Sequence, residues 1–154
     1  MKHNSFDIVV IGGGHAGVEA ALIADHYELT VLLVTMDPKA AGRMSCNPAI
    51  GGLAKGQIVR EIDVLGGIMG SLADKAGLQF KTLNKKKGRA VWSPRAQIDK
   101  RHYEKLVLRT LDISNVVVLA GEVVSLVYDK TAIDGVVLSC LLYTSDAADE
   151  HGCG

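Results

Sequence analysis

Blocks of apolar and polar residues at the start of the chain predict a strand, a helix and a second strand. Residues 6–11 form an apolar, β-favouring run that ends in three glycines, and residues 16–24 form a helix-favouring stretch rich in alanine. Residues 29–34 are a second, nearly continuous apolar run, which is typical of a parallel strand covered on both faces. Because a helix joins the two strands, we expect a right-handed βαβ unit.

The next stretch predicts a loop and a short helix. Residues 36–56 are rich in glycine and lack periodicity, which for so long a connection indicates a functional loop. Residues 57–65 predict a helix that places Ile58, Ile62 and Leu65 on one face, and Gly66–Gly67 would end it.

The second half of the chain predicts one longer helix among short strands. The helix is expected from Pro94 to Leu111, where several residues recur at helical spacing. Strands are expected at 78–83, 116–119, 123–127 and 136–138. The alternation of strands and helices predicts an α/β fold with a doubly wound, Rossmann-like sheet.

Residues 139–154 differ from the rest of the chain because they show no usable periodicity. Their centre, from Cys140 to Glu150, looks like the translation of a transposon-based sequencing adapter. We therefore predict a domain fragment over residues 1–138 and a non-native tail over 139–154 that makes no core contacts. The alternative is a genuine acidic surface tail.

Composition narrows the class of protein. The 154 residues are 48% hydrophobic and 22% charged, which fits a soluble piece of about one domain. We expect no membrane segment, because no apolar run approaches ~18 to 20 residues. The chain begins without a secretion signal, so a cytoplasmic location is expected. The three cysteines are too few and too scattered for a disulfide framework, and no metal-ligand spacing joins them.

The phosphate-binding turn is the first candidate for chemistry. Gly12-x-Gly14-x-x-Gly17 directly follows a predicted strand and opens a predicted helix, which is the context that this motif requires. Its glycines permit a tight turn, the approach of a pyrophosphate and close helix packing, respectively. The helix N-terminus then faces the phosphate charge. The alternative is a purely structural glycine turn.

The second strand ends at Thr35, with Asp37 just beyond it. Many NAD-binding proteins carry an acidic residue at this point to bind the ribose. A threonine can still donate a hydrogen bond to a ribose hydroxyl. The glycine turn alone therefore leaves the choice between NAD and FAD open.

Several blocks together resemble the glucose-inhibited division protein A family, the FAD subunit of tRNA uridine 5-carboxymethylaminomethyl modification. They are Gly12–Gly17, the Ser-Cys-Asn-Pro-Ala-Ile-Gly-Gly block at 45–52, Lys55-Gly56, and the Arg-Glu-Ile-Asp-x-Leu-Gly-Gly block at 60–67. The resemblance covers about residues 5–138, and the block at 45–52 is its most specific part. Family members are several times longer, so the resemblance implies an amino-terminal fragment.

The family resemblance implies cofactors, partners and contacts. FAD would contact Gly12, Gly13, Gly14, His15, Ala16 and Gly17, and the backbone of Val123 would contact its adenine. The resemblance also implies NADH, methylene-tetrahydrofolate, tRNA, a GTPase partner subunit and a homodimer for the full-length protein. The fragment itself is expected to be inactive.

Cys46 and His15 each allow two interpretations. Five residues after Cys46 stands Gly51, which excludes the paired cysteines of flavin disulfide reductases. Cys46 is then either a residue of the flavin pocket, with a possible role as a catalytic nucleophile, or a small buried structural thiol. His15 either carries a charge that assists an anion or is a surface histidine.

The neutral net charge conceals a basic segment. Residues 75–105 carry ten Lys or Arg residues against two acidic residues, Asp99 and Glu104. The candidates for phosphate contacts with tRNA are Lys85, Lys86, Lys87, Arg89, Arg95, Lys100 and Arg101. A solvated charged loop is the alternative. Trp92 is either a residue that stacks on a base or a packing residue.

Two other hypotheses compete with the tRNA-modifying flavoenzyme. The related folate- and FAD-dependent tRNA methyltransferases share the glycine turn but not the block at 45–52. The polypeptide is alternatively a nucleotide-binding fragment without catalysis, because the nicotinamide-facing and substrate-binding parts of the family have no counterpart in it.

Overall fold

The predicted βαβ unit forms one end of the molecule. A computed structural model describes residues 5–130 and 132–139. Strand β1 (Ile8–Ile11), helix α1 (His15–His26) and strand β2 (Val31–Thr35) follow in this order, and the two strands pair in parallel. Strand β6 (Val117–Ala120) pairs in parallel with the other edge of β2, which gives the order β1-β2-β6.

The apolar run of β2 is buried on both faces of this sheet. Val31 and Leu33 belong to a core cluster shared with the helices. Leu32 and Val34 belong to a second cluster, shared with Leu138. The pleat sends successive side chains to opposite faces, so a strand covered on both sides requires apolar residues at every position.

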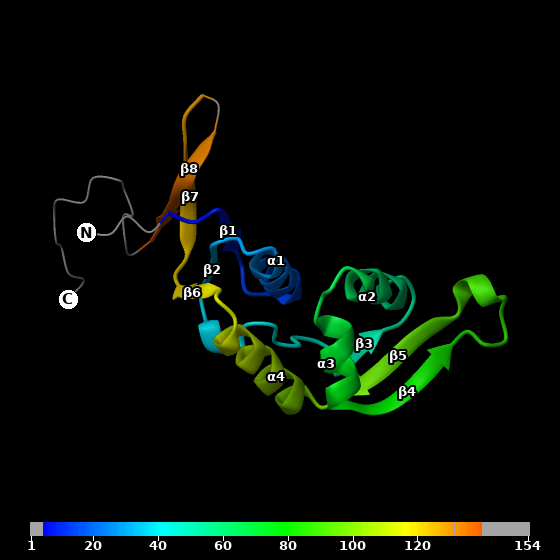
Figure 1. Cartoon of the computed structure of the whole chain (residues 1–154). Helices are drawn as coiled ribbons and strands as arrows, with labels where there is room; N and C mark the ends of the chain where they lie inside the picture. Colours follow the sequence, from blue (N-terminus) through cyan, green and yellow to red (C-terminus); the bar gives the residue numbers. More distant parts are fainter. Residues whose placement is uncertain (1–4, 131, 140–154) are drawn as a thin grey trace.

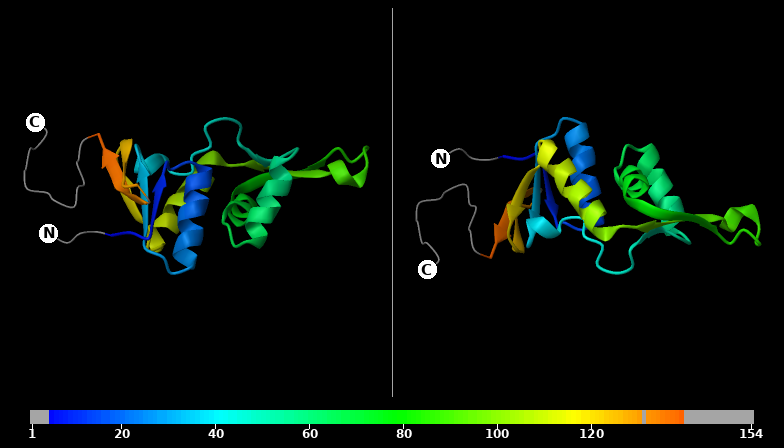
Figure 2. Two further views of the ribbon diagram at one scale, coloured as in Figure 1. Left: turned by 90° about the horizontal axis from the view of Figure 1, so that it is seen from above. Right: turned by 90° about the horizontal axis from the view of Figure 1, so that it is seen from below.

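Different elements cover the two faces of the sheet. Helices α1 and α4 (Lys100–Ile113) lie on one face, and the antiparallel hairpin of β7 (Val123–Tyr128) and β8 (Ile133–Leu138) lies on the other (Figure 2). The α/β prediction is confirmed. In the described part of the chain, the second face is covered by strands rather than by helices.

A second, antiparallel sheet lies beyond the helices. It consists of β3 (Ala49–Gly51), β4 (Gly77–Leu83) and β5 (Ser93–Ile98) in the order β3-β5-β4. Helices α2 (Lys55–Val64) and α3 (Met69–Ala76) pack beside it, and single 3-10 turns η1 (Pro38–Ala40) and η2 (Arg89–Val91) interrupt the loops. Strands β4 and β5 extend from the body as a long hairpin (Figure 1).

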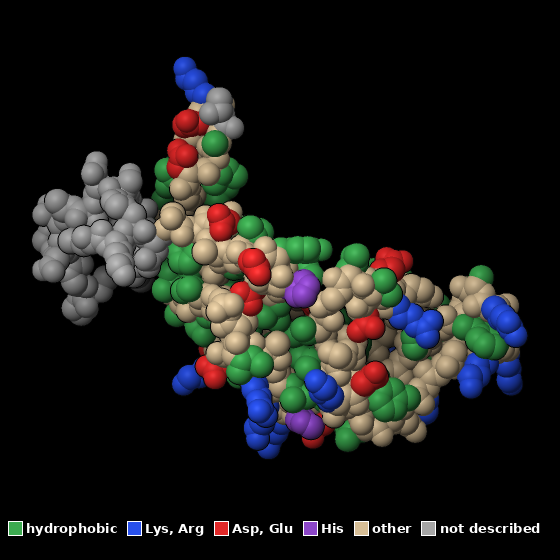
Figure 3. All heavy atoms as spheres, viewed as in Figure 1, with side chains coloured by type: hydrophobic (Ala, Val, Ile, Leu, Met, Phe, Trp, Pro, Cys, Tyr) green, Lys and Arg blue, Asp and Glu red, His purple; other side chains and the backbone are tan. Residues whose placement is uncertain are grey.

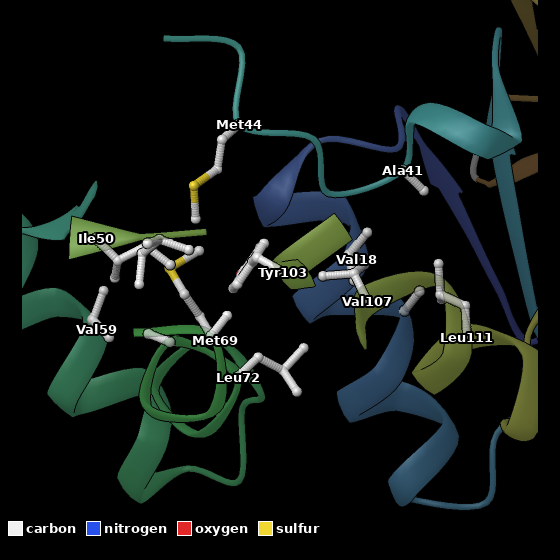
Figure 4. Packing of buried hydrophobic residues seen from close by; sticks show 14 of the residues in the cluster. Val18, Ala41, Met44, Ile50, Val59, Met69, Leu72, Tyr103, Val107 and Leu111 are labelled. Carbon is white, nitrogen blue, oxygen red and sulfur yellow. The ribbon is translucent and has the colours of Figure 1, made fainter. Parts of the chain in front are cut away.

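One hydrophobic core joins the two parts. It combines Val18 of α1 and Val107 of α4 with Ile50 of β3 and Leu72 of α3 (Figure 4). Tyr103 lies between the two groups and is only 2% exposed. The glycine turn and the second sheet are therefore held in a defined relation to each other.

The structure corrects the expectation for residues 94–98. These residues form part of strand β5 and not the beginning of a helix, because they pair with both β3 and β4. Helix α4 begins only at Lys100, where the Asp99 side chain accepts a hydrogen bond from the His102 N–H. A carboxylate at this position satisfies one of the otherwise unpaired N–H groups of a helix start.

The structure also corrects the predicted apolar face of the helix over 57–65. Helix α2 exists, and Gly66, with a φ of 93°, ends it as expected. However, Ile58 and Leu65 are exposed, and the helix buries Val59 and Gly56 instead. Strand β3 and helix α3 were not predicted. Of the predicted tail, residues 140–154 lie outside the described residues.

Candidate nucleotide-binding site

The carboxyl ends of the three parallel strands meet at one edge of the sheet. The Gly12 N–H donates a 2.8 Å hydrogen bond to the carbonyl oxygen of Val34, which fixes the turn after β1 to the end of β2. The Gly121 N–H donates a 3.0 Å hydrogen bond to the carbonyl oxygen of Thr35, which fixes the turn after β6 to the same strand. In open α/β sheets, ligands bind outside this edge.

The glycines at both ends of the G-x-G-x-x-G motif are structural requirements. Gly12 has a φ of 101°, a conformation that only glycine adopts readily. A Cβ at Gly17 would collide with the carbonyl oxygen of Gly12. Helix α1 therefore passes so close to the end of β1 that no side chain fits at Gly17. The turn thus has the geometry expected of the motif.

Gly14 differs from the other two glycines because its space is open. A Cβ at this position would meet no atom within 4 Å, and the φ of Gly14 is −70°, which any residue adopts. No side chain caps the start of α1, to which Gly14 is the N-cap. The first N–H groups of a helix lack partners within the helix and carry partial positive charge. The site therefore offers space and donors for a phosphate group.

Thr35 lies directly beside the turn. A Cβ on Gly13 would come within 2.6 Å of the Thr35 Oγ1, so only glycine fits at this point. Asp37 lies further on, and its carboxylate accepts a 3.0 Å hydrogen bond from the Lys39 N–H, which caps η1. Thr35 is consequently the polar side chain at the end of β2 that lies next to the turn.

The ring of His15 packs against the interior of the protein. Its ring stacks on Tyr103 with 5.9 Å between centroids, and its Nε2 atom is buried without a hydrogen-bond partner. Burial lowers the pKa of His15, and the nearby Lys55 lowers it further. The expectation of a surface histidine does not hold for this partly buried ring, and the predicted contact of His15 with the cofactor stays a prediction.

Val123 and Ala16 lie at the same sheet edge as the turn. Val123 begins β7 two residues after Gly121, and its half-buried side chain packs against the cluster of Leu32, Val34 and Leu138. Ala16 is exposed in the first turn of α1. The backbone of residues 121–123 is thus brought next to the end of β2. The predicted contact of Val123 with adenine stays a prediction.

The loop after η1 leads from the turn to Cys46. The Gly42 N–H donates a 2.8 Å hydrogen bond to the Gly13 carbonyl oxygen. Further along, the Lys100 Nζ donates a 2.6 Å hydrogen bond to the carbonyl oxygen of Cys46, which ties the loop to the start of α4. Cys46 is an exposed free thiol in this chain. The alternative of a buried structural thiol is therefore wrong here.

The basic candidates lie in two different parts of the molecule, the β4–β5 hairpin and helix α4. Lys85, Lys86, Lys87 and Arg89 are exposed at the end of the β4–β5 hairpin, whereas Arg101 lies on α4. Arg95 is half-buried beside a cavity of about 640 Å³ between α2, α3 and the hairpin, and Lys85 lines the same cavity. Sequence reasoning missed this cavity, because its walls come from segments far apart in the chain.

These features define the chain as a dinucleotide-binding type of α/β domain joined to a second, antiparallel sheet. The sequence model of the family described as "Glucose inhibited division protein A" matches residues 7–146, and the chain belongs to this family. The match runs beyond Leu138, where we predict the native part to end, and that boundary stays a prediction.

Named relatives and solved structures agree with the family assignment. The chain is 50% identical over 135 residues to a tRNA uridine 5-carboxymethylaminomethyl modification enzyme MnmG of Sulfurihydrogenibium sp., covering 86% of this chain and 22% of the relative. It is 48% identical over 134 residues to the Aquifex aeolicus enzyme of the same name, covering 86% and 22%. A crystal structure of Aquifex aeolicus GidA superposes with a TM-score of 0.84 at 47% identity, covering 88% of this chain and 23% of that one.

A more distant likeness shows the fold alone. PqsL of Pseudomonas aeruginosa, described as a probable FAD-dependent monooxygenase, superposes with a TM-score of 0.60 at 18% identity, covering 88% of this chain and 39% of that one. The chain spans about a fifth of the length of the modification enzymes that it matches.

Proposed function

We propose that this chain forms the FAD-binding amino-terminal part of a flavoenzyme that modifies the wobble uridine of tRNA. The observation that carries this proposal is the open space at Gly14 beside the uncapped start of α1. Membership of the family and the names of its relatives support the tRNA substrate. The full-length protein is expected to act in the cytoplasm.

The chain's own residues would bind and orient the cofactor. The backbone of Gly12 to Gly17 would hold the pyrophosphate, and the Thr35 hydroxyl, next to Gly13, is placed to donate a hydrogen bond to the ribose. The backbone of Val123 would contact the adenine. Bound FAD supplies the redox step of the reaction, and the protein supplies binding and orientation.

Cys46 is the candidate for contact with the flavin or the substrate. It is exposed, and Lys100 fixes its backbone through the carbonyl oxygen. Both observations suit a side chain that has to be accessible and held in place. The role of a nucleophile would require that the thiol reach a substrate carbon.

The remaining parts of the proposal concern the full-length protein. We infer that it transfers a one-carbon unit from methylene-tetrahydrofolate, with glycine or ammonium, to the 5-position of the uridine. We further infer NADH as reductant, a GTPase partner subunit and a homodimer. Each inference rests on family resemblance, and the name of the relatives supports only the 5-position of uridine as the site of modification.

The competing hypothesis is that the 154-residue chain is a nucleotide-binding fragment without catalysis. The observation that favours it is the chain's coverage of only 22% of its relatives. Both hypotheses place a dinucleotide at the same turn. They differ in whether this chain alone can modify tRNA.

The test uses a full-length family protein that carries this sequence at its amino terminus. Its flavin would be identified by absorbance and mass spectrometry, and the wobble nucleoside of tRNA would be analysed after incubation with the partner, the folate and NADH. We expect bound FAD and a modified 5-position. Absence of flavin, or an unchanged wobble uridine, would contradict the proposal. The 154-residue chain, run in parallel, is expected to leave the uridine unchanged.

A further inference from the structure

The hairpin of β4 and β5 carries a run of exposed basic residues at its end, Lys85, Lys86, Lys87 and Arg89. We define the arm as residues 77–98 and its tip as residues 84–92. Figures 1 and 3 show that the arm extends away from the body and that Lys and Arg side chains gather near its far end. Residues 77–98 include six Lys or Arg residues and no Asp or Glu. The positive charge of the arm is therefore not neutralised within the arm.

Hydrogen bonds within the tip hold its backbone in a defined conformation. The Lys87 N–H donates a 2.8 Å hydrogen bond to the Asn84 carbonyl oxygen, and the Asn84 side-chain amide donates one of 3.3 Å to the Val91 carbonyl oxygen. The Trp92 indole N–H donates one of 3.1 Å to the Lys87 carbonyl oxygen. These bonds connect both sides of the tip. Part of the entropic cost of ordering the lysines for binding is thus already met by folding.

Trp92 supports the tip through two contacts. The guanidinium of Arg89 lies 5.7 Å from the centroid of the Trp92 ring, and the indole N–H is already engaged. Trp92 therefore helps to hold the tip, although its side chain is still 40% exposed. The contacts that the exposed lysines of the tip can make are with phosphate groups.

We propose that the arm binds the phosphodiester backbone of the RNA substrate through Lys85, Lys86 and Lys87, with Trp92 as the positioning residue. This inference rests on the proposed tRNA-modifying function. Lysine ammonium groups bind phosphates as point charges, and such contacts supply affinity without sequence discrimination. The arm thereby holds the RNA, and recognition of the wobble nucleotide belongs to other parts of the protein.

The test measures tRNA binding by a full-length family protein that carries this sequence, over a range of salt concentrations. The tip variant is Lys85→Ala, Lys86→Ala, Lys87→Ala. The control variant is Lys105→Ala, Arg109→Ala, Lys130→Ala, which removes the same charge from exposed positions outside the arm. Flavin absorbance per polypeptide is recorded for every variant, so that loss of the cofactor is seen separately from loss of RNA.

We expect the tip variant to bind tRNA about tenfold more weakly or worse, with a salt slope reduced by about one for each lost phosphate contact. The control variant should keep most of the affinity, and all variants should keep their flavin. Equal losses in the tip and control variants, or an unchanged slope in the tip variant, would overturn the proposal. Tip-dependent binding to phosphatidylserine vesicles with no effect on tRNA would also overturn it.

A second variant separates positioning from charge. Trp92→Phe retains an aromatic ring but removes the hydrogen bond to the Lys87 carbonyl oxygen. We expect weaker tRNA binding with an unchanged salt slope, because all three lysines remain. A reduced slope would show that Trp92 does not act through lysine placement. Wild-type affinity of Trp92→Phe would show that Trp92 does not position the lysines.

The flavin readout separates the two proposals. If the tip variant retains its flavin and binds tRNA normally, the arm proposal fails and the cofactor proposal stands.

Discussion

The carboxylate of Glu19 accepts a 2.6 Å hydrogen bond from the backbone N–H of Met69, fifty residues further along the chain. The same carboxylate accepts a 3.0 Å hydrogen bond from the Ile68 N–H. Helix α3 begins at Met69 and has no side-chain cap of its own. A side chain of α1 thus caps α3, and it joins the glycine-turn helix to the second part of the molecule.

Replacing Glu19 by Ala should destabilise the chain by about 1 to 3 kcal/mol, because two partly buried N–H groups lose a charged acceptor. Glu19→Gln retains an acceptor but loses the favourable charge at the helix start, so its effect should be smaller. Urea unfolding of the 154-residue chain measures both values. Equal stability of the wild type and Glu19→Ala would show that the cap is not energetically important.

The stability of the chain should depend on pH through His15. Burial, and then the charge of Lys55, lower its folded-state pKa below the usual value of 6.5. At pH values well above 6.5 the ring is neutral in both states and contributes no pH dependence. As the pH falls through 6.5 the unfolded state binds the proton more readily, so stability is lost.

His15→Phe is the matched variant for this effect, because it keeps a ring beside Tyr103 but cannot bind a proton. Unfolding would be measured for both proteins between about pH 8 and pH 5, a range that spans the ordinary histidine pKa. We expect the wild type to lose more stability than the variant on acidification. Parallel pH profiles would contradict the assignment, since all other histidines are common to both proteins.

Gly17→Ala should destabilise the fold itself. The added methyl group would collide with the carbonyl oxygen of Gly12, and neither backbone segment can move without disturbing the turn. Overpacking of this kind costs about 1 to 3 kcal/mol or more. Thermal unfolding checks this expectation. A variant with an unchanged melting temperature would show that α1 can shift away from β1.

Cys46→Ser should leave the stability of the chain almost unchanged, within about 0.5 kcal/mol, because the thiol is exposed. In the full-length protein we expect FAD to be retained and modification of tRNA to be reduced. The two readouts are flavin absorbance and analysis of the wobble nucleoside. Full modification activity in the variant would exclude a catalytic role, and a large loss of stability would restore the structural interpretation.

The sequence predicted those parts of the fold that are determined locally. The βαβ unit follows from two apolar runs and a glycine turn, and helix α2 ends just before Gly66, as its sequence indicates. Residues 94–98 carry a helical pattern, yet pairing with two neighbouring strands makes them a strand. Tertiary pairing of this kind overrides local preference, so the pattern alone could not reveal it.

In the candidate site, too, locally determined features could be predicted and features that depend on tertiary packing could not. The glycine motif could be predicted because each glycine answers a backbone requirement within a few residues. The hydrogen bond from Lys100 to Cys46 joins residues 54 positions apart, and it depends on how α4 packs. The inward orientation of His15 likewise depends on Tyr103, which belongs to a distant helix. No spacing in the sequence contains this information.

The central claim is that the glycine turn holds the pyrophosphate of FAD, and Gly14→Ala tests it most directly. A methyl group at Gly14 meets no protein atom within 4 Å, and the φ of −70° suits alanine, so the fold should be preserved. The methyl group would instead occupy the space through which a pyrophosphate approaches the backbone. In a full-length family protein that carries this sequence, flavin absorbance per polypeptide should fall to near zero while tRNA binding and the melting temperature of the flavin-free protein are retained. A Gly14→Ala protein with its full flavin content would contradict the claim.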